Sequence, residues 1–204
     1  MPGHSAAMPV ARLLLLLTCL LAAHPAAALQ FNVAPFAEGE VILWVRGKID
    51  RGDTQRLHSA LAYARRSGDV VSIAFDSPGG NVREGIALAD EVKRIGLPLV
   101  IPDKRMCASI CFLVFAAAPT RYVAHTARIG VHSAAELNGA ESQASMAATT
   151  IMAREAARFG VPEPILGKMV RTAPGQMAWL DDADLASMGV VQYNPDRPAG
   201  RRPP

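Results

Sequence analysis

Two residues of this chain have side chains that could form a nucleophile and its base. Ser109 precedes His132 by 23 positions. A serine hydroxyl becomes a nucleophile when a neighbouring base accepts its proton, and imidazole, with an ordinary pKa of about 6.5, suits that role near neutral pH. A Gly79-Gly80 pair before Ser109 can bring backbone N–H groups close to a substrate and stabilise developing negative charge. Together these residue types favour acyl transfer.

Cys107 and Cys111 flank Ser109 at positions four residues apart. On a helix this spacing places the two Cα atoms about 6 Å apart, which a disulfide accepts. We predict a disulfide that braces the turn at Ser109, with two reduced thiols acting as small buried hydrophobes as the alternative. Zinc is not favoured, because the pair lacks partners at metal-site spacing.

Alternating strands and helices must position these side chains. The run from 70 to 75 is continuously apolar, which is typical of a strand covered on both faces of a parallel sheet. It stops at Ser77-Pro78-Gly79-Gly80, a strong turn signal. The alternation favours crossover units on a mostly parallel sheet. Strands are expected at 41–45, 70–75, 97–101 and 129–132, and helices at 53–66, 83–95, 107–118, 139–159, 164–171 and 181–188.

Residues 1–28 have the pattern of a signal peptide. Arg12 gives a positive start, an apolar stretch follows, and three alanines end at Ala28. The apolar stretch is shorter than the roughly 20 residues that span a bilayer, so cleavage near Leu29 is expected, with an uncleaved N-terminal anchor as the alternative. No stable membrane anchor is expected later in the chain. One domain covers residues 29–193, and a Pro/Arg-rich tail at 194–204 is expected to be disordered.

Charge and cysteine content restrict the class of protein. The formal net charge is +3, and it comes from the two ends that lie outside residues 29–194. A basic face for nucleic acid is therefore not indicated. Of three cysteines, Cys19 lies in the predicted signal peptide, which leaves one pair for a compartment where disulfides persist.

Five sequence blocks, including the helical segment at 82–90, resemble the Clp protease catalytic subunit and the wider crotonase-like superfamily. The resemblance begins at Asp76-Ser-Pro-Gly-Gly80 and continues through the segments that contain Ser109 and His132. It ends in a closing segment at 179–191, and spans roughly residues 41–193. The resemblance implies a crotonase-type α/β fold with a mostly parallel sheet and crossover helices.

The same resemblance implies a site. Ser109 and His132 would be catalytic, and the N–H groups of Gly80 and Ile110 would form the oxyanion hole. The position where these proteases carry an aspartate falls on Met177, which cannot orient an imidazole. We therefore expect a Ser/His dyad, with a backbone carbonyl or water orienting His132.

A Ser/Lys dyad is the other catalytic arrangement to weigh. It would require Lys168, which is the one lysine after the nucleophile, and we do not favour it.

The predicted function is an exported serine peptidase of the periplasm or the secreted fraction. It would hydrolyse a peptide or protein substrate, and neither a metal nor a cofactor is expected. It would have no ATPase of its own, since no phosphate-binding glycine motif occurs in the sequence. A homo-oligomer that assembles through residues 139–171 is expected, because the proteins that this chain resembles assemble through their long late helices.

Two alternatives remain open. The first is a catalytically silent binding or scaffold protein, which the methionine at position 177 favours and which a serine-directed probe would leave unlabelled. The second is an enzyme acting on coenzyme A thioesters, since crotonases use the same glycine-rich turn. Export argues against this second alternative, because coenzyme A is a cytoplasmic metabolite.

Overall fold

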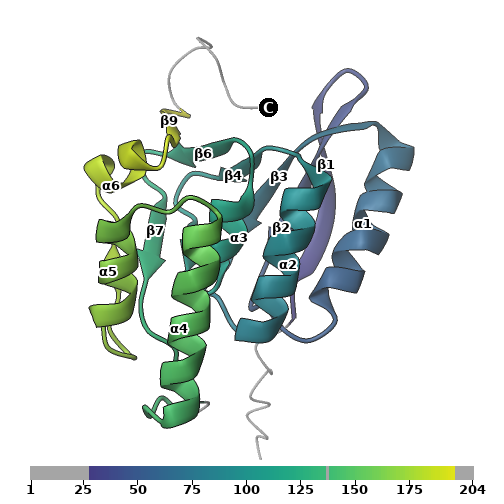
Figure 1. Ribbon diagram of the computed structural model, residues 1–204. Coiled ribbons are helices and arrows are strands. Elements are labelled where there is room, and N and C mark those ends of the chain that lie inside the picture. The colour runs from purple at the N-terminus through teal and green to yellow at the C-terminus, as the bar shows by residue number, and fades with distance from the viewer. Residues whose placement is uncertain (1–27, 137, 196–204) are drawn as a thin grey trace, which may run out of the picture.

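A computed structural model describes residues 28–136 and 138–195 of the chain. Nearly all of the predicted signal peptide and most of the predicted tail lie outside the described residues. The described chain folds as α-helices packed on a sheet, with α1, α2 and α4 in front of it in Figure 1. None of the helices in this part of the chain is long and apolar enough to cross a membrane.

A larger sheet forms the centre of the fold. Within the described residues it contains six strands in the order β1 (Gln30–Ala37), β2 (Glu40–Arg46), β3 (Asp69–Asp76), β4 (Leu99–Ile101), β6 (Arg121–Ala124) and β9 (Val191–Tyr193). The edge strand β1 pairs antiparallel with β2, and every other pair is parallel. Helices α1 (Asp53–Ser67) and α2 (Val82–Ile95) connect successive parallel strands. The predicted mostly parallel sheet with crossover helices is confirmed.

A smaller sheet carries the residues of chemical interest. It consists of β5 (Met106–Ala108), β7 (Arg128–Val131) and β8 (Ala178–Trp179), with β7 in the middle. β5 and β7 are parallel, whereas β7 and β8 are antiparallel. The remaining helices are α3 (Cys111–Ala117), α4 (Gln143–Arg158), α5 (Glu163–Arg171) and α6 (Asp182–Ser187).

Local chemistry explains where α2 and α6 begin. The side chain of Asn81 accepts a hydrogen bond from the Glu84 N–H at the start of α2. Asp181 does the same for the Asp184 N–H at the start of α6. Such caps satisfy N–H groups that have no partner inside the helix. Each cap therefore fixes the point at which the chain enters its helix.

Several predicted element boundaries are wrong, and the helix expected at 139–159 begins only at Gln143. The helix expected at 53–66 is α1, with Gly52 at its cap position in the left-handed conformation. The helix expected at 107–118 begins only at Cys111. Cys107 instead belongs to β5, since its strand pairs with β7. An apolar stretch that is buried throughout has no periodicity that separates a short strand from a helix.

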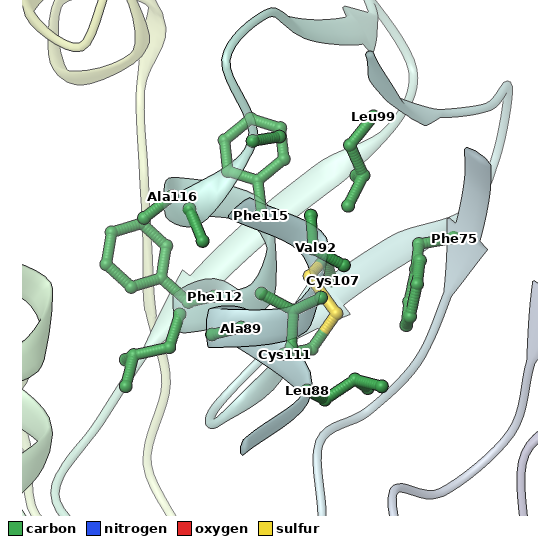
Figure 2. Packing of buried hydrophobic residues seen from close by; sticks show 14 of the residues in the cluster. Phe75, Leu88, Ala89, Val92, Leu99, Cys107, Cys111, Phe112, Phe115 and Ala116 are labelled. Carbon is green, nitrogen blue, oxygen red and sulfur yellow. A yellow bond between two sulfur atoms is a disulfide. The ribbon is translucent and has the colours of Figure 1, made fainter. Parts of the chain in front are cut away.

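The hydrophobic core lies between the large sheet and the helices. Figure 2 shows Phe75 of β3, Leu88 of α2 and Phe112 of α3 within one cluster of buried side chains. Every residue of α3 is buried. A helix that is apolar on all sides needs partners all round, and α3 contacts α2 on one side and α4 on another. Helix α3 is therefore held rigidly beside the turn that precedes it.

Arg121 at the start of β6 joins the ends of two helices. Its guanidinium donates to the carbonyl oxygens of Ala116 at 2.9 Å and Met188 at 2.7 Å. Burial lowers the pKa of Arg121, because desolvation disfavours the charged form. We expect Arg121→Met to lower the free energy of unfolding by about 2 kcal/mol, since two carbonyls lose a charged donor. Chemical denaturation measures this, and an unchanged midpoint would show that water replaces the guanidinium at no cost.

Candidate active site

Ser109 lies in the two-residue turn between β5 and α3. Its φ angle is 58°, in the left-handed region that residues other than glycine rarely adopt. Its N–H donates to the Gly130 carbonyl at 2.9 Å, and its own carbonyl accepts from the Phe112 N–H at 2.9 Å. The side chain is partly exposed although the residues on either side are buried. A strained turn between a strand and a helix thus presents a hydroxyl at the surface.

The Gly79-Gly80 turn packs directly against Ser109. A Cβ atom at Gly79 would lie 2.7 Å from both the Ala108 carbonyl oxygen and the Ser109 Cβ. The φ angle of Gly79 is also positive, at 99°. Since any side chain here would collide with backbone, the site requires glycine at this position.

The two predicted oxyanion donors have free N–H groups. A parallel bridge joins Gly80 to Ile49, in which Ile49 bonds to the residues on either side of Gly80. The Gly80 N–H therefore points away from Ile49. Within the described residues, neither the Gly80 N–H nor the Ile110 N–H donates a hydrogen bond.

His132 follows the end of β7, the strand next to β5. The register pairs Ala108 with Gly130, so Ser109 and His132 both lie just beyond the ends of adjacent parallel strands. His132 is half-buried, and burial lowers its pKa by disfavouring the imidazolium, although a backbone contact at Ser133 acts in the opposite direction. In the part of the chain that the structure describes, no hydrogen bond joins Ser109 Oγ to His132, and His132 Nδ1 has no partner.

Met177 occupies the place opposite His132. β7 and β8 pair Gly130 with Trp179 and Val131 with Ala178, so one further step of this register places Met177 opposite His132. The Met177 Sδ would lie 2.6 Å from a Cβ atom at Gly130. A thioether therefore lies against β7 two residues before His132, at the position where the resemblance placed an aspartate.

Lys168 is engaged elsewhere. Its Nζ pairs with the Asp184 carboxylate and lies 3.9 Å from the Asp181 carboxylate. Its pKa is raised, first by the hydrogen bond to Asp184. A lysine held in its charged form cannot accept a proton from Ser109.

Two residues of the site had no role in the sequence reasoning. The Ser77 Oγ, which is fully buried, accepts from the Gly79 N–H at 3.1 Å. The Asp76 carboxylate accepts from the Met106 N–H at 3.3 Å and pairs with Arg46 at 3.2 Å. The Ser77 bond therefore lies within the glycine turn, and the Asp76 bond joins the residue before that turn to β5. Both residues belong to the Asp76-Ser-Pro-Gly-Gly80 block that resembles the Clp protease family, and this position could have indicated their role in the site.

The structure contains the predicted disulfide between Cys107 and Cys111, with Cα atoms 5.3 Å apart. It joins a strand to the first residue of a helix rather than two positions of one helix. Among the described residues, no group of three or more His, Cys, Asp or Glu side chains could hold a metal ion.

The fold and the paired strand ends define a crotonase-type α/β protein. The family model described as Clp protease matches residues 28–162, which is more than half of the chain. The chain belongs to the Clp protease family, and this membership supports a serine peptidase. No curated protein matches the sequence.

Solved structures of Clp proteases share the fold. A mutant of ClpP1 from Listeria monocytogenes is 18% identical, with a TM-score of 0.57, and the match covers 78% of this chain and 92% of that chain. For the ClpP protease catalytic domain from Plasmodium falciparum, the identity is 16%, the TM-score 0.56 and the coverage 80% and 89%. A membrane-bound stomatin-specific protease is 14% identical, with a TM-score of 0.57 and coverage of 75% and 78%. These similarities show the fold.

Proposed function

We propose that this protein is an exported serine peptidase with Ser109 as its nucleophile and His132 as its general base. One observation carries the proposal. Ser109 is held in a left-handed turn against Gly79, at the strand end beside His132. A strained conformation at a partly exposed serine is typical of a functional site. Membership of the Clp protease family supports the same chemistry.

Each group has one role in the proposed reaction. Ser109 Oγ attacks the carbonyl carbon of a peptide bond while His132 accepts the hydroxyl proton. The N–H groups of Gly80 and Ile110 then stabilise the negative oxygen of the tetrahedral intermediate. His132 returns the proton to the departing amine. Because no hydrogen bond joins Ser109 Oγ to His132 in the described residues, the proposed reaction requires that the two groups come together when substrate binds.

A groove beside His132 could hold a side chain of the peptide substrate. It lies between α4, α5 and the segment that follows His132. The groove is lined by Ser133, Ala134, Glu141, Ser145, Met146, Thr149, Thr150 and Val170. Its walls combine hydroxyl groups with exposed apolar side chains, so it offers both hydrogen bonds and apolar contact.

The proposed location is outside the cytoplasm, in the periplasm or secreted. A disulfide beside the nucleophile persists in such compartments, and the predicted signal peptide at 1–28 is consistent with export. Because ATP is absent there, we propose an enzyme that works without an ATPase. Fractionation of cells that express the full chain tests this, and recovery in the cytoplasm with an intact N-terminus would contradict it.

We also propose that the protein forms a homo-oligomer through α4 and α5. Ile151 of α4 is an exposed apolar side chain that lies outside the proposed groove. Sedimentation of the purified protein measures the assembly, and a monomer at micromolar concentration would contradict it.

A catalytically silent binding protein is the second candidate. It is favoured by the thioether of Met177 opposite His132 and by the unpartnered His132 Nδ1 in the described residues. In a silent protein the histidine would not activate Ser109, so the two candidates differ in the reactivity of one hydroxyl.

The test is covalent labelling of the purified mature protein with a fluorophosphonate probe. A peptidase is expected to form one adduct, which peptide mass mapping assigns to Ser109. Absence of labelling at a probe concentration that saturates a known serine peptidase would favour the silent protein.

The labelling rate should depend on the protonation of His132. Because burial lowers the pKa of His132, its neutral, proton-accepting form persists below the ordinary value of about 6.5. The rate is therefore expected to fall on acidification with a midpoint below about pH 6.5. Rates measured from pH 4 to 9 locate the midpoint, and a value above 6.5 would contradict this assignment.

Met177→Asp should shift that midpoint upward. A carboxylate opposite His132 favours the imidazolium, so its pKa is expected to rise by about one unit or more. Gln55→Asp adds the same charge at an exposed position on α1, away from the proposed oligomer surface, and should leave the midpoint unchanged. Equal midpoints in the two variants would show that position 177 does not face His132.

A further inference from the structure

The turn that contains Ser109 consists of two residues, Ser109 and Ile110, between β5 and α3. Ser109 adopts a left-handed conformation, with φ at 58°. Residues with a side chain disfavour this conformation, so the surroundings must hold it in place.

Two contacts hold the turn from the side of the glycine loop and α2. Gly79 packs on Ser109, as described above. Ile110 is fully buried, and its Cγ1 would lie 2.2 Å from a Cβ atom at Gly85 of α2. These contacts locate the two turn residues, while β7 holds the strand before them and α2 and α4 pack on the helix after them.

The disulfide adds a covalent link between β5 and α3 to this packing. Cys107 lies one residue before the end of β5 and Cys111 is the first residue of α3, and their Cα atoms are 5.3 Å apart. Both are fully buried, in the same cluster as Leu88 and Val92 of α2, and Figure 2 shows the sulfur–sulfur bond among these side chains. A covalent bond across so short a loop excludes conformers in which the turn opens.

We infer that the Cys107–Cys111 disulfide is a positioning element for the nucleophile. It holds Ser109 in its left-handed conformation and so fixes the direction of Oγ and of the Ile110 N–H. The sulfurs are buried beneath the turn while Ser109 is partly exposed, so they position the reacting groups without touching substrate. Only the kinetic test of this inference depends on the proposed function.

The kinetic test compares three forms of the protein: wild type, the double variant Cys107→Ala/Cys111→Ala, and wild type reduced by dithiothreitol. In the reduction the disulfide gains two electrons and two protons to give two thiols, and dithiothreitol is oxidised to its cyclic disulfide. The maximal rate of fluorophosphonate labelling and the probe concentration at half-maximal rate are measured well below each melting temperature.

We expect the maximal labelling rate to fall about tenfold in the variant and in reduced wild type, because the reactive conformer becomes a minor one. The half-saturating probe concentration should stay unchanged. Reoxidation should restore the wild-type rate, and dithiothreitol should not alter the double variant. A role in global stability alone would not change a rate measured well below the melting temperature.

A second readout does not depend on activity. Hydrogen exchange of a peptide covering residues 106–113 should become at least about tenfold faster without the disulfide, since the turn opens more often. A peptide from α1 should exchange at an unchanged rate. The comparison is repeated in Ser109→Ala, which carries no nucleophile.

Three other outcomes would contradict either the inference or the proposed function. Unchanged labelling and unchanged exchange at 106–113 would show that the disulfide does not position the turn. Loss of folding in both forms that lack it would also overturn the inference, because the bond would then stabilise the whole fold. If wild type is never labelled, the proposed function fails, and the exchange measurement alone decides the inference.

Discussion

Ser109→Ala is expected to abolish fluorophosphonate labelling, with a loss of at least about a thousandfold relative to wild type. The probe reacts with a serine hydroxyl whose proton a base removes, and the structure places Ser109 in a strained, partly exposed turn beside the strand end that carries His132. His132→Ala should cause a comparable loss, because residues that act as one unit lose activity together.

Matched controls separate this effect from general damage. Ser59→Ala removes an exposed serine on α1, and His58→Ala removes an exposed histidine whose Nε2 lies 3.3 Å from the Glu91 carboxylate. Both controls should label at the wild-type rate. If wild type and Ser109→Ala label equally while the controls fold normally, Ser109 is not an activated nucleophile and the binding-protein candidate gains support.

Gly80→Ala is expected to lower the free energy of unfolding by about 4 kcal/mol or more, or to prevent folding. A Cβ atom here would lie 2.1 Å from the Ile49 carbonyl oxygen and 2.8 Å from the Ile49 nitrogen. The φ angle of 150° adds strain for any L side chain. Backbone atoms joined by a β-bridge cannot move aside as a flexible side chain could.

Gly96→Ala is the matched control. Gly96 also has a positive φ, of 73°, but nothing lies within 4 Å of an added Cβ. Gly96→Ala should therefore lower the free energy of unfolding only by the cost of the left-handed conformation, about 1 kcal/mol. Chemical denaturation compares the two variants. Equal losses would show that the loop at Gly80 moves freely, and that its N–H is not held in a fixed position for an oxyanion.

The sequence predicted the central elements of the fold with small errors in their ends. The run at 70–75 is β3, which the structure extends by one residue at each end, and the helix expected at 83–95 is α2. The edge strand β1 was not predicted, and Pro35 within it weakens the strand pattern. β6 was also missed. It is four residues long, and two of them are only half-buried.

The sequence by itself determined the candidate nucleophile, its base and the cysteine pair, since these depend on residue type and on short spacings. The tertiary structure alone decided that Gly79 packs on Ser109 and that the Met177 thioether lies against Gly130. It also decided that the disulfide joins β5 to α3. The physical reason is that parallel and antiparallel pairing of β5, β7 and β8 joins segments far apart in the chain. The register of such pairing follows from packing and hydrogen bonds, which local periodicity does not encode.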